Sequence, residues 1–183
     1  MIINGVEMRS PAVDDAAALT EVLIRNRAYM APYDPWRPEE YYTEAAQRAR
    51  IEGMLAEQEA GRLAAYLLVE PAGGAVIGAI NLGNIVRGPL LSGGVGYWID
   101  QDRQGRGLIT AAVEQVCRTA RDELGLHRVE AQTLVDNTAS MRVLAKAGFT
   151  ECGLAPRYLH INGAWRDHRL FQRVLHDDPP PAP

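Results

Sequence analysis

The feature that most constrains this fold is a change of hydrophobic period on either side of one glycine-containing turn, residues 101–107. Residues 95–99 read V-G-Y-W-I, which is typical of a short strand. Over residues 108–124 the apolar side chains recur every three or four positions, which predicts a helix. The turn between the two contains Gly105 and Gly107. A strand, a tight turn and a helix in this order indicate a layered structure that contains both element types.

The periodic segments around this unit predict the rest of the fold. Strands are expected over residues 6–9, 63–70, 75–82, 95–99, 129–135, 157–161 and 165–175, and helices over residues 14–26, 43–59, 108–124 and 139–147. Three prolines within residues 29–38 interrupt the helical pattern, and Asn162-Gly163 is a hairpin signal. The order β-α-α-β-β-β-α-β-α-β-β favours an α/β (α+β) fold. We expect one mixed, mostly antiparallel sheet of about seven strands with about four flanking helices.

Length and composition indicate a single domain and exclude several classes of protein. We expect a domain over residues 1–176 and a disordered, proline-rich tail over residues 177–183. The net charge of −4 argues against a nucleic-acid partner. The sequence has no apolar run of ~18 residues and no signal peptide. We therefore expect no membrane partner and a cytoplasmic location. Cys117 and Cys152 lack metal-site spacing with the four histidines, so we expect two buried thiols and no metal.

The turn itself has the properties of a phosphate-binding site. Gly105 and Gly107 allow the backbone to approach a ligand closely, and Arg103 and Arg106 add positive charge to a helix N-terminus. A helix start with two solvated arginines is the simpler alternative. A dinucleotide-binding turn is a third interpretation, but its third glycine is replaced by Thr110 and antiparallel-type strands precede it.

Several segments resemble one known family. Gln104-x-x-Gly107-x-Ile109 is similar to the (Gln/Arg)-x-x-Gly-x-(Gly/Ala) acyl-CoA signature of the GCN5-related N-acetyltransferases (GNAT family). Ile109 departs from the signature, and the RimJ/RimL group, which modifies the N-termini of ribosomal proteins, accepts a larger residue there. Further similarity to this group lies in residues 126–131 and 136–149, and similarity to the ribosomal-protein-alanine branch, RimJ, lies in residues 26–37, 84–88 and 162–168. The resemblance covers about residues 5–175.

This resemblance implies a sheet that splays at an acyl-CoA site. Acetyl-CoA, the co-substrate, would enter between the strands that contain residues 97–99 and 129–135. The positions that the resemblance assigns to acetyl-CoA are Trp98, Ile99, Arg103, Gln104, Gly105, Arg106, Gly107, Leu108, Ile109, Thr110 and Asn137.

The resemblance also assigns a catalytic role to Ser140, as the proton donor to the departing thiolate. Ser140 follows Asn137 by three residues and shares its helical face, although a polar residue at a helix start is an equal alternative. No base is evident, since many relatives carry a glutamate where this chain has Gly94. A relay through water to Asn81, Glu130 or Tyr158 is an alternative, and each of these residues also has a structural interpretation.

Two further potential participants are interpreted as structural. Asp167 and His168 are neighbours on a strand and should point to opposite faces, so they do not form a catalytic pair. Cys117 is expected to face inward from the helix after the turn, without a role in the reaction.

The amine acceptor is expected to contact the aromatic loops, at Tyr29, Tyr33, Trp36, Arg87 and Tyr158. At pH 7 about 10% of a free α-amine is neutral, whereas only about 0.04% of a lysine is. The difference between the two pKa values corresponds to about 3 kcal/mol. An enzyme without a strong base therefore suits a protein N-terminus, most simply that of a ribosomal protein. A small amine such as an antibiotic or polyamine, and a CoA-binding sensor without turnover, are the alternatives. The sequence leaves open whether the acyl group is bulkier than acetyl and whether the protein is a homodimer.

Overall fold

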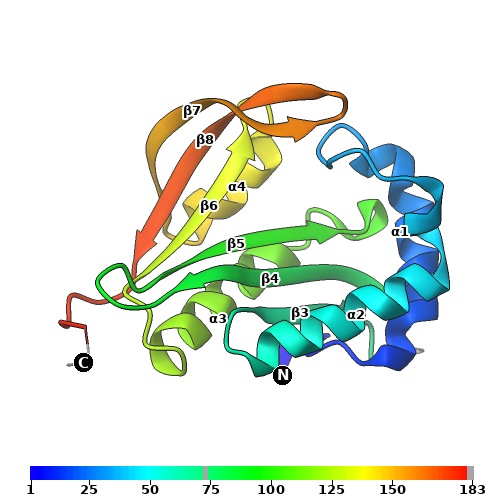
Figure 1. Cartoon of the computed structure of the whole chain (residues 1–183), viewed down its shortest axis with the longest axis horizontal. Coiled ribbons are helices and arrows are strands. Elements are labelled where there is room, and N and C mark those ends of the chain that lie inside the picture. The colour runs from blue at the N-terminus through cyan, green and yellow to red at the C-terminus, as the bar shows by residue number, and fades with distance from the viewer. Residues whose placement is uncertain (72–73, 181–183) are drawn as a thin grey trace.

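The computed structural model of the chain describes residues 1–71 and 74–180. Within these residues, eight strands form one sheet in the order β1-β2-β3-β4-β5-β6-β8-β7, with four α-helices around it (Figure 1). The strands are β1 (Ile2–Ile3), β2 (Val6–Arg9), β3 (Ala64–Val69), β4 (Val76–Val86), β5 (Ser92–Ile99), β6 (Arg128–Leu134), β7 (Thr150–Ile161) and β8 (Ala164–Val174). The helices are α1 (Ala16–Met30), α2 (Glu44–Glu59), α3 (Leu108–Asp122) and α4 (Thr138–Lys146), and the short 3₁₀ segments are η1 (Val13–Asp15), η2 (Glu39–Tyr42) and η3 (Gln101–Arg103).

The predicted fold class and element order are confirmed, with differences at the edges of the sheet. All neighbouring strands are antiparallel except β5 and β6, which are parallel. The eighth strand, β1, was not predicted because it is only two residues long, and it pairs with β2 across a turn at Asn4 and Gly5. Strand β7 begins at Thr150, earlier than predicted.

Two helix layers cover opposite faces of the sheet. Helices α1 and α2 pack on one face through a cluster that includes Leu19, Ile51 and Ala79. Helices α3 and α4 pack on the other face through a cluster that includes Val113 and Leu144. The amphipathic pattern that predicted α3 reflects this packing, since its apolar stripe faces the sheet.

Three further expectations concern the cysteines, the tail and the membrane. Cys117 is buried as expected, whereas the prediction of a buried thiol is wrong for Cys152, which is exposed on the edge strand β7. Residues 177–180 follow β8 without regular structure, and the remainder of the predicted tail, residues 181–183, lies outside the described residues. Among the described residues, no helix is both long and apolar enough to cross a membrane.

The feature of the fold that positions the site is the parting of β5 and β6. The two strands pair only at Ser92↔Arg128, Gly93↔Val129 and Gly94↔Glu130. Beyond Gly94, β5 continues to pair with β4, whereas β6 continues to pair with β8. Figure 1 shows the resulting wedge between the two strands. The splayed sheet that the family resemblance implies is therefore present.

We predict that Gly78→Ala destabilises the fold where β4 meets β5. A Cβ atom at Gly78 would lie 2.7 Å from the backbone carbonyl oxygen of Trp98, so the two strands would have to shift, at a cost of about 1–3 kcal/mol. Gly53→Ala on α2, where an added Cβ meets nothing within 4 Å, should instead stabilise the protein by about 0.5–1 kcal/mol. Urea unfolding measures both changes, and equal effects of the two substitutions would contradict the steric argument.

Candidate functional site

The wedge between β5 and β6 opens into a cleft of about 940 Å³. Its lining includes residues 95–99 of β5, residues 131–134 of β6, the turn before α3 and the first turns of α4. Every residue assigned to acetyl-CoA from the sequence lines this cleft, and so does Ser140. The structure thus brings together segments that are separated by more than forty residues along the chain.

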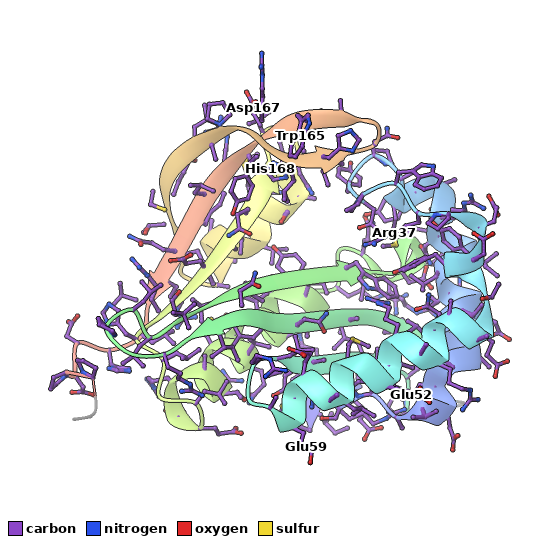
Figure 2. All side chains as sticks on the ribbon, in the orientation of Figure 1. Arg37, Glu52, Glu59, Trp165, Asp167 and His168 are labelled. Atoms are coloured by element: carbon purple, nitrogen blue, oxygen red, sulfur yellow. The ribbon has the colours of Figure 1, made fainter. Side chains whose placement is uncertain are left out.

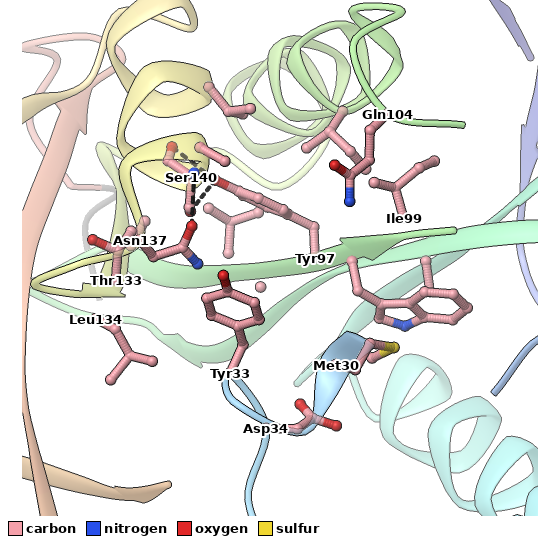
Figure 3. Close-up of a pocket in the computed structure, with 18 of the residues that line it drawn as sticks. Met30, Tyr33, Asp34, Tyr97, Ile99, Gln104, Thr133, Leu134, Asn137 and Ser140 are labelled. Carbon is pink, nitrogen blue, oxygen red and sulfur yellow. Dashed lines mark hydrogen bonds between the residues drawn. The ribbon is translucent and has the colours of Figure 1, made fainter. Parts of the chain in front are cut away.

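Strand alternation divides the cleft into two sides. Tyr97 packs with the core around α3, whereas its neighbour Trp98 packs with the core around α1 and α2. On β6, Ala131 belongs to the α3 core, so the adjacent Gln132 points to the opposite face. Figure 3 shows Ser140 on one side of β5 and Tyr33 and Asp34 on the other. We name these the α3 side and the α1 side of the cleft.

The glycine turn presents backbone amides to the cleft. Gly105 and Gly107 have φ values of 72° and 70°, a conformation that glycine adopts without strain. Gly107 caps α3 without any side-chain hydrogen bond, and the first backbone bond of the helix is Ala111 N–H to the Gly107 oxygen at 3.0 Å. The amides of residues 108–110 therefore have no partner within the helix, which leaves them free to bind an anion.

The two arginines of the turn differ in their surroundings. Arg103 donates to Glu70 at 2.7 Å, and this bond lowers the pKa of the Glu70 carboxyl below its usual range. Among the described residues Arg106 forms no ion pair. Arg106 is therefore the stronger candidate to bind an anion. The sequence alone did not distinguish it from Arg103. Arg142 and Lys146, which sequence reasoning did not single out, line the cleft one helical turn apart on α4.

Helix α1 holds the turn in place through buried polar contacts. The Asn26 side chain is fully buried, accepts from Gln101 N–H at 2.9 Å and donates to the Val22 oxygen at 2.9 Å. Arg25 forms an ion pair with the buried Asp100 at the end of β5. Because a buried polar group is costly unless it is paired, these contacts fix the path of the chain after β5.

Ser140 lies in a short hydrogen-bond chain on the α3 side. Asn137 is the N-cap of α4, as predicted, and its Oδ1 accepts from Ser140 N–H at 3.0 Å. The Ser140 Oγ lies 2.8 Å from the Tyr97 hydroxyl oxygen, as the dashed lines in Figure 3 show. Burial raises the pKa of Tyr97 to about 12, so this phenol stays protonated throughout the neutral range. Tyr97 was not identified from the sequence, although alternation with Trp98 predicts that the two rings face opposite sides.

The acceptor residues predicted from the sequence are only partly brought together. Tyr29 and Tyr33 line the cleft on the α1 side. The other three do not line the cleft. Trp36 is 73% exposed, the Arg87 guanidinium donates to the Leu124 carbonyl, and the Tyr158 ring packs beside the cleft-lining His168. Loop residues of this kind are placed by long-range packing, which local sequence patterns do not encode.

The α1 side contains polar residues that sequence reasoning missed. Asp34, Arg37 and Arg50 line the cleft, and burial raises the pKa of the Asp34 carboxyl while the two arginines oppose this rise. The main-chain oxygen of Asp34 also accepts from Asn162 N–H at 3.3 Å. This bond joins the loop after α1 to the tip of the β7–β8 hairpin, and Figure 1 shows the two segments meeting there.

The residues considered for a proton relay, and the neighbours Asp167 and His168 on β8, differ in whether they line the cleft. Asn81 lines the cleft, whereas Glu130 and Tyr158 do not, and Glu130 lies 3.3 Å from Arg128. Asp167 and His168 do point to opposite faces. Asp167 is exposed and accepts from Arg157 N–H at 2.8 Å, while the buried His168 lines the cleft.

Comparisons with known proteins agree with this geometry. Residues 6–150 match the family described as an acetyltransferase (GNAT) domain. The chain is 34% identical over 173 residues to the probable N-acetyltransferase YjcK of Bacillus subtilis (strain 168), covering 94% of this chain and 96% of that protein. It is 35% identical over 157 residues to the ribosomal protein uS5-alanine N-acetyltransferase of Escherichia coli (strain K12), covering 85% and 80%.

Solved structures show the same similarity. A ribosomal-protein-S5-alanine acetyltransferase from Vibrio fischeri superposes with a TM-score of 0.92 at 30% identity, over 97% of each chain. RimJ of Mycobacterium smegmatis, solved in complex with CoA-disulfide, gives a TM-score of 0.87 at 32% identity, over 92% of this chain and 81% of that one.

We predict that ionisation of Tyr97 measurably lowers the stability of the protein at high pH. Its pKa is about 12 in the folded protein and about 10 when unfolded, so the stabilising effect is complete below pH 10 and is lost as the pH rises towards 12. By pH 11 the loss attributable to Tyr97 is about 1.4 kcal/mol. Urea unfolding at pH 9 and pH 11 measures it as the difference between the wild-type protein and Tyr97→Phe. Equal pH dependence of the two proteins would show that Tyr97 is not shielded from solvent.

Proposed function

Because the chain belongs to the acetyltransferase (GNAT) family and is an acetyl-CoA-dependent N-acetyltransferase, we propose that it acetylates the N-terminal α-amine of a protein. The observation that carries the proposal is the cleft where β5 and β6 part, because it joins an anion-binding side to a separate side with aromatic and charged groups. Relatives that cover 85% of this chain are named ribosomal protein uS5-alanine N-acetyltransferases, so a ribosomal protein is the acceptor that we propose first.

The α3 side suits acetyl-CoA in three respects. The free amides of residues 108–110 and the Arg106 side chain would hold the pyrophosphate. Beyond Gly94 the edge of β5 that faces β6 has unpaired backbone groups, which match the amides of the pantetheine arm. The Thr133 hydroxyl is buried without a hydrogen-bond partner in the described part of the chain, and Thr133 lines the cleft. Together with Asn137, these groups provide the positions that we propose for the co-substrate.

Ser140 is the proton donor that we propose for the thiol product. The acceptor nitrogen attacks the thioester carbonyl and gives up one proton, a C–N bond forms and the C–S bond breaks, and the sulfur takes the proton of the Ser140 hydroxyl. Ser140 then regains a proton from solvent. The neutral Tyr97 hydroxyl fixes the position of the Ser140 Oγ at 2.8 Å, and Asn137 fixes its backbone.

The α1 side supports an α-amine as the acceptor. A lysine is almost entirely charged at neutral pH, whereas about 10% of an α-amine is already neutral at pH 7. Tyr29 and Tyr33 provide aromatic surface for an extended peptide, and the bond between Asn162 and Asp34 closes one end of this side. A chain terminus fits such an opening better than a side chain on a folded surface does.

We predict that the enzyme releases CoA rapidly with peptides that begin with a free alanine or serine, and at least ~100-fold more slowly with the same peptides blocked at the α-amine and carrying one lysine. The pKa difference between the two amines is the physical reason. A thiol-release assay measures both rates, with a panel of aminoglycosides and polyamines alongside. Turnover confined to that panel would contradict the proposed acceptor, and acetyl-CoA binding without turnover on any amine would indicate a sensor.

We predict that Ser140→Ala lowers kcat about 100-fold and leaves the affinity for acetyl-CoA within about twofold, because only the donor is lost. The Asn137 cap survives, since it accepts from the backbone of residue 140. Tyr97→Phe keeps the serine hydroxyl and removes its partner, so its kcat should fall less. Undiminished kcat in Ser140→Ala would remove the donor role.

A further inference from the structure

On the α1 side of the cleft, one buried side chain has the geometry of a proton acceptor. We propose that His168 is the general base of the reaction and that its Nε2 takes the proton from the acceptor amine. This proposal rests on the proposed function only in requiring direct attack by an amine. It concerns a residue that strand alternation alone presents as structural.

The position of His168 follows from the register of three strands. On β8 it lies opposite Leu134 of β6 and Ala155 of β7. Directly opposed residues share a face of the sheet, so His168 lies on the face of Leu134 and Gln132, away from α3. The residue is only 4% exposed and lines the cleft. His168 and Ser140 therefore occupy opposite sides of the same opening, as a base for the acceptor and an acid for the thiol must.

The tautomer of His168 is set by its own strand. Its Nδ1 lies 3.0 Å from the backbone oxygen of Arg166. A carbonyl oxygen can only accept a hydrogen bond, so Nδ1 carries the proton, and Nε2 of the neutral ring keeps a free lone pair. Among the described residues the imidazole has no other hydrogen bond. A backbone contact that fixes one nitrogen as donor leaves the other as acceptor, which is the form that a base requires.

An aromatic and an aliphatic side chain border the His168 ring. Tyr158 packs beside it with ring centroids 5.5 Å apart, and Leu134 lies across the register. Asp167 points away, to Arg157 N–H, and the Arg166 guanidinium pairs with Asp136 at 3.2 Å. Figure 2 shows His168 on β8 and Arg37 across the opening, in the segment that follows α1.

Asp34 is the rival base, because it is the carboxylate that lines the same side of the cleft. Burial raises the pKa of its carboxyl, which favours it as a base, whereas Arg37 and Arg50 favour its charged form and oppose that rise. Its backbone also holds the hairpin tip, so the position of Asp34 has a structural explanation that His168 lacks.

In the proposed step, the acceptor nitrogen gives one proton to Nε2 of His168 as the C–N bond forms. The sulfur receives one proton from Ser140 as the C–S bond breaks. His168 then releases its proton to solvent and Ser140 takes one up, so a neutral amine and a thioester become an amide and a thiol with no net change in protons.

The test compares His168→Asn with His176→Asn, a histidine beyond the end of β8 and outside the cleft. Asparagine retains a donor near the position of Nδ1, so the contact with Arg166 is preserved while the Nε2 lone pair is lost. Rates of thiol release are measured from pH 7 to pH 9 on whichever amine the wild-type enzyme accepts best. Acetyl-CoA affinity and thermal unfolding are measured for both variants.

We predict that kcat/KM of His168→Asn falls about 100-fold at pH 7 with unchanged acetyl-CoA affinity, and that the deficit is about the same at pH 9 for an α-amine substrate. The neutral fraction of the amine rises from about 10% to about 90% over this range, which raises the rates of both enzymes equally and leaves their ratio unchanged. His176→Asn should match the wild-type profile.

Three results would overturn the proposal. The first is wild-type activity in His168→Asn, and the second is an equal fall in kcat/KM in His176→Asn. The third is a fall in kcat/KM in Asp34→Asn that exceeds the fall in His168→Asn. A wild-type enzyme that prefers a small amine would contradict the proposed acceptor while leaving the comparison of the two histidine variants intact. The two hypotheses therefore fail separately.

Discussion

The end of β5–β6 pairing after Gly94 is the constraint on which the rest of the molecule depends. Three parallel pairs hold the strands together, and beyond them each strand is committed to a different neighbour. The chain after β5 is held to α1 by Asn26 and by the ion pair between Arg25 and Asp100, whereas β6 follows the long β8. Opposite anchors at the two strands separate them, and the open backbone edges are then available to a ligand instead of to each other.

The same two strands also assign chemistry to opposite sides of the opening. Because side chains alternate, Tyr97 reaches Ser140 on one face while Trp98 meets the α1 layer on the other. On β8, the face shared with Leu134 carries His168 to the acceptor side. The proposed acid and base therefore lie on opposite sides of the opening between the strands. Neither has to move for one proton to leave the nitrogen and another to reach the sulfur.

The sequence predicts elements that are encoded locally and misses those that are placed from a distance. The turn at Gly105 and Gly107 and the cap at Asn137 lie where their own neighbours indicate. The short β1 was missed although Asn4-Gly5 carries the same hairpin signal as Asn162-Gly163, because a two-residue strand has no readable period. Trp36 and Arg87 were assigned to the acceptor by residue type alone, and tertiary packing directs both elsewhere.

The contact between Asn162 and Asp34 bears on how often one end of the acceptor side opens. It is one backbone hydrogen bond between two surface loops, and such a bond contributes about 1 kcal/mol. A single bond of this strength does not hold two surface loops together permanently, and surface loops move on the nanosecond-to-microsecond timescale. This end of the acceptor side can therefore open and close many times within one turnover, since typical enzymes complete about 1–1,000 turnovers per second.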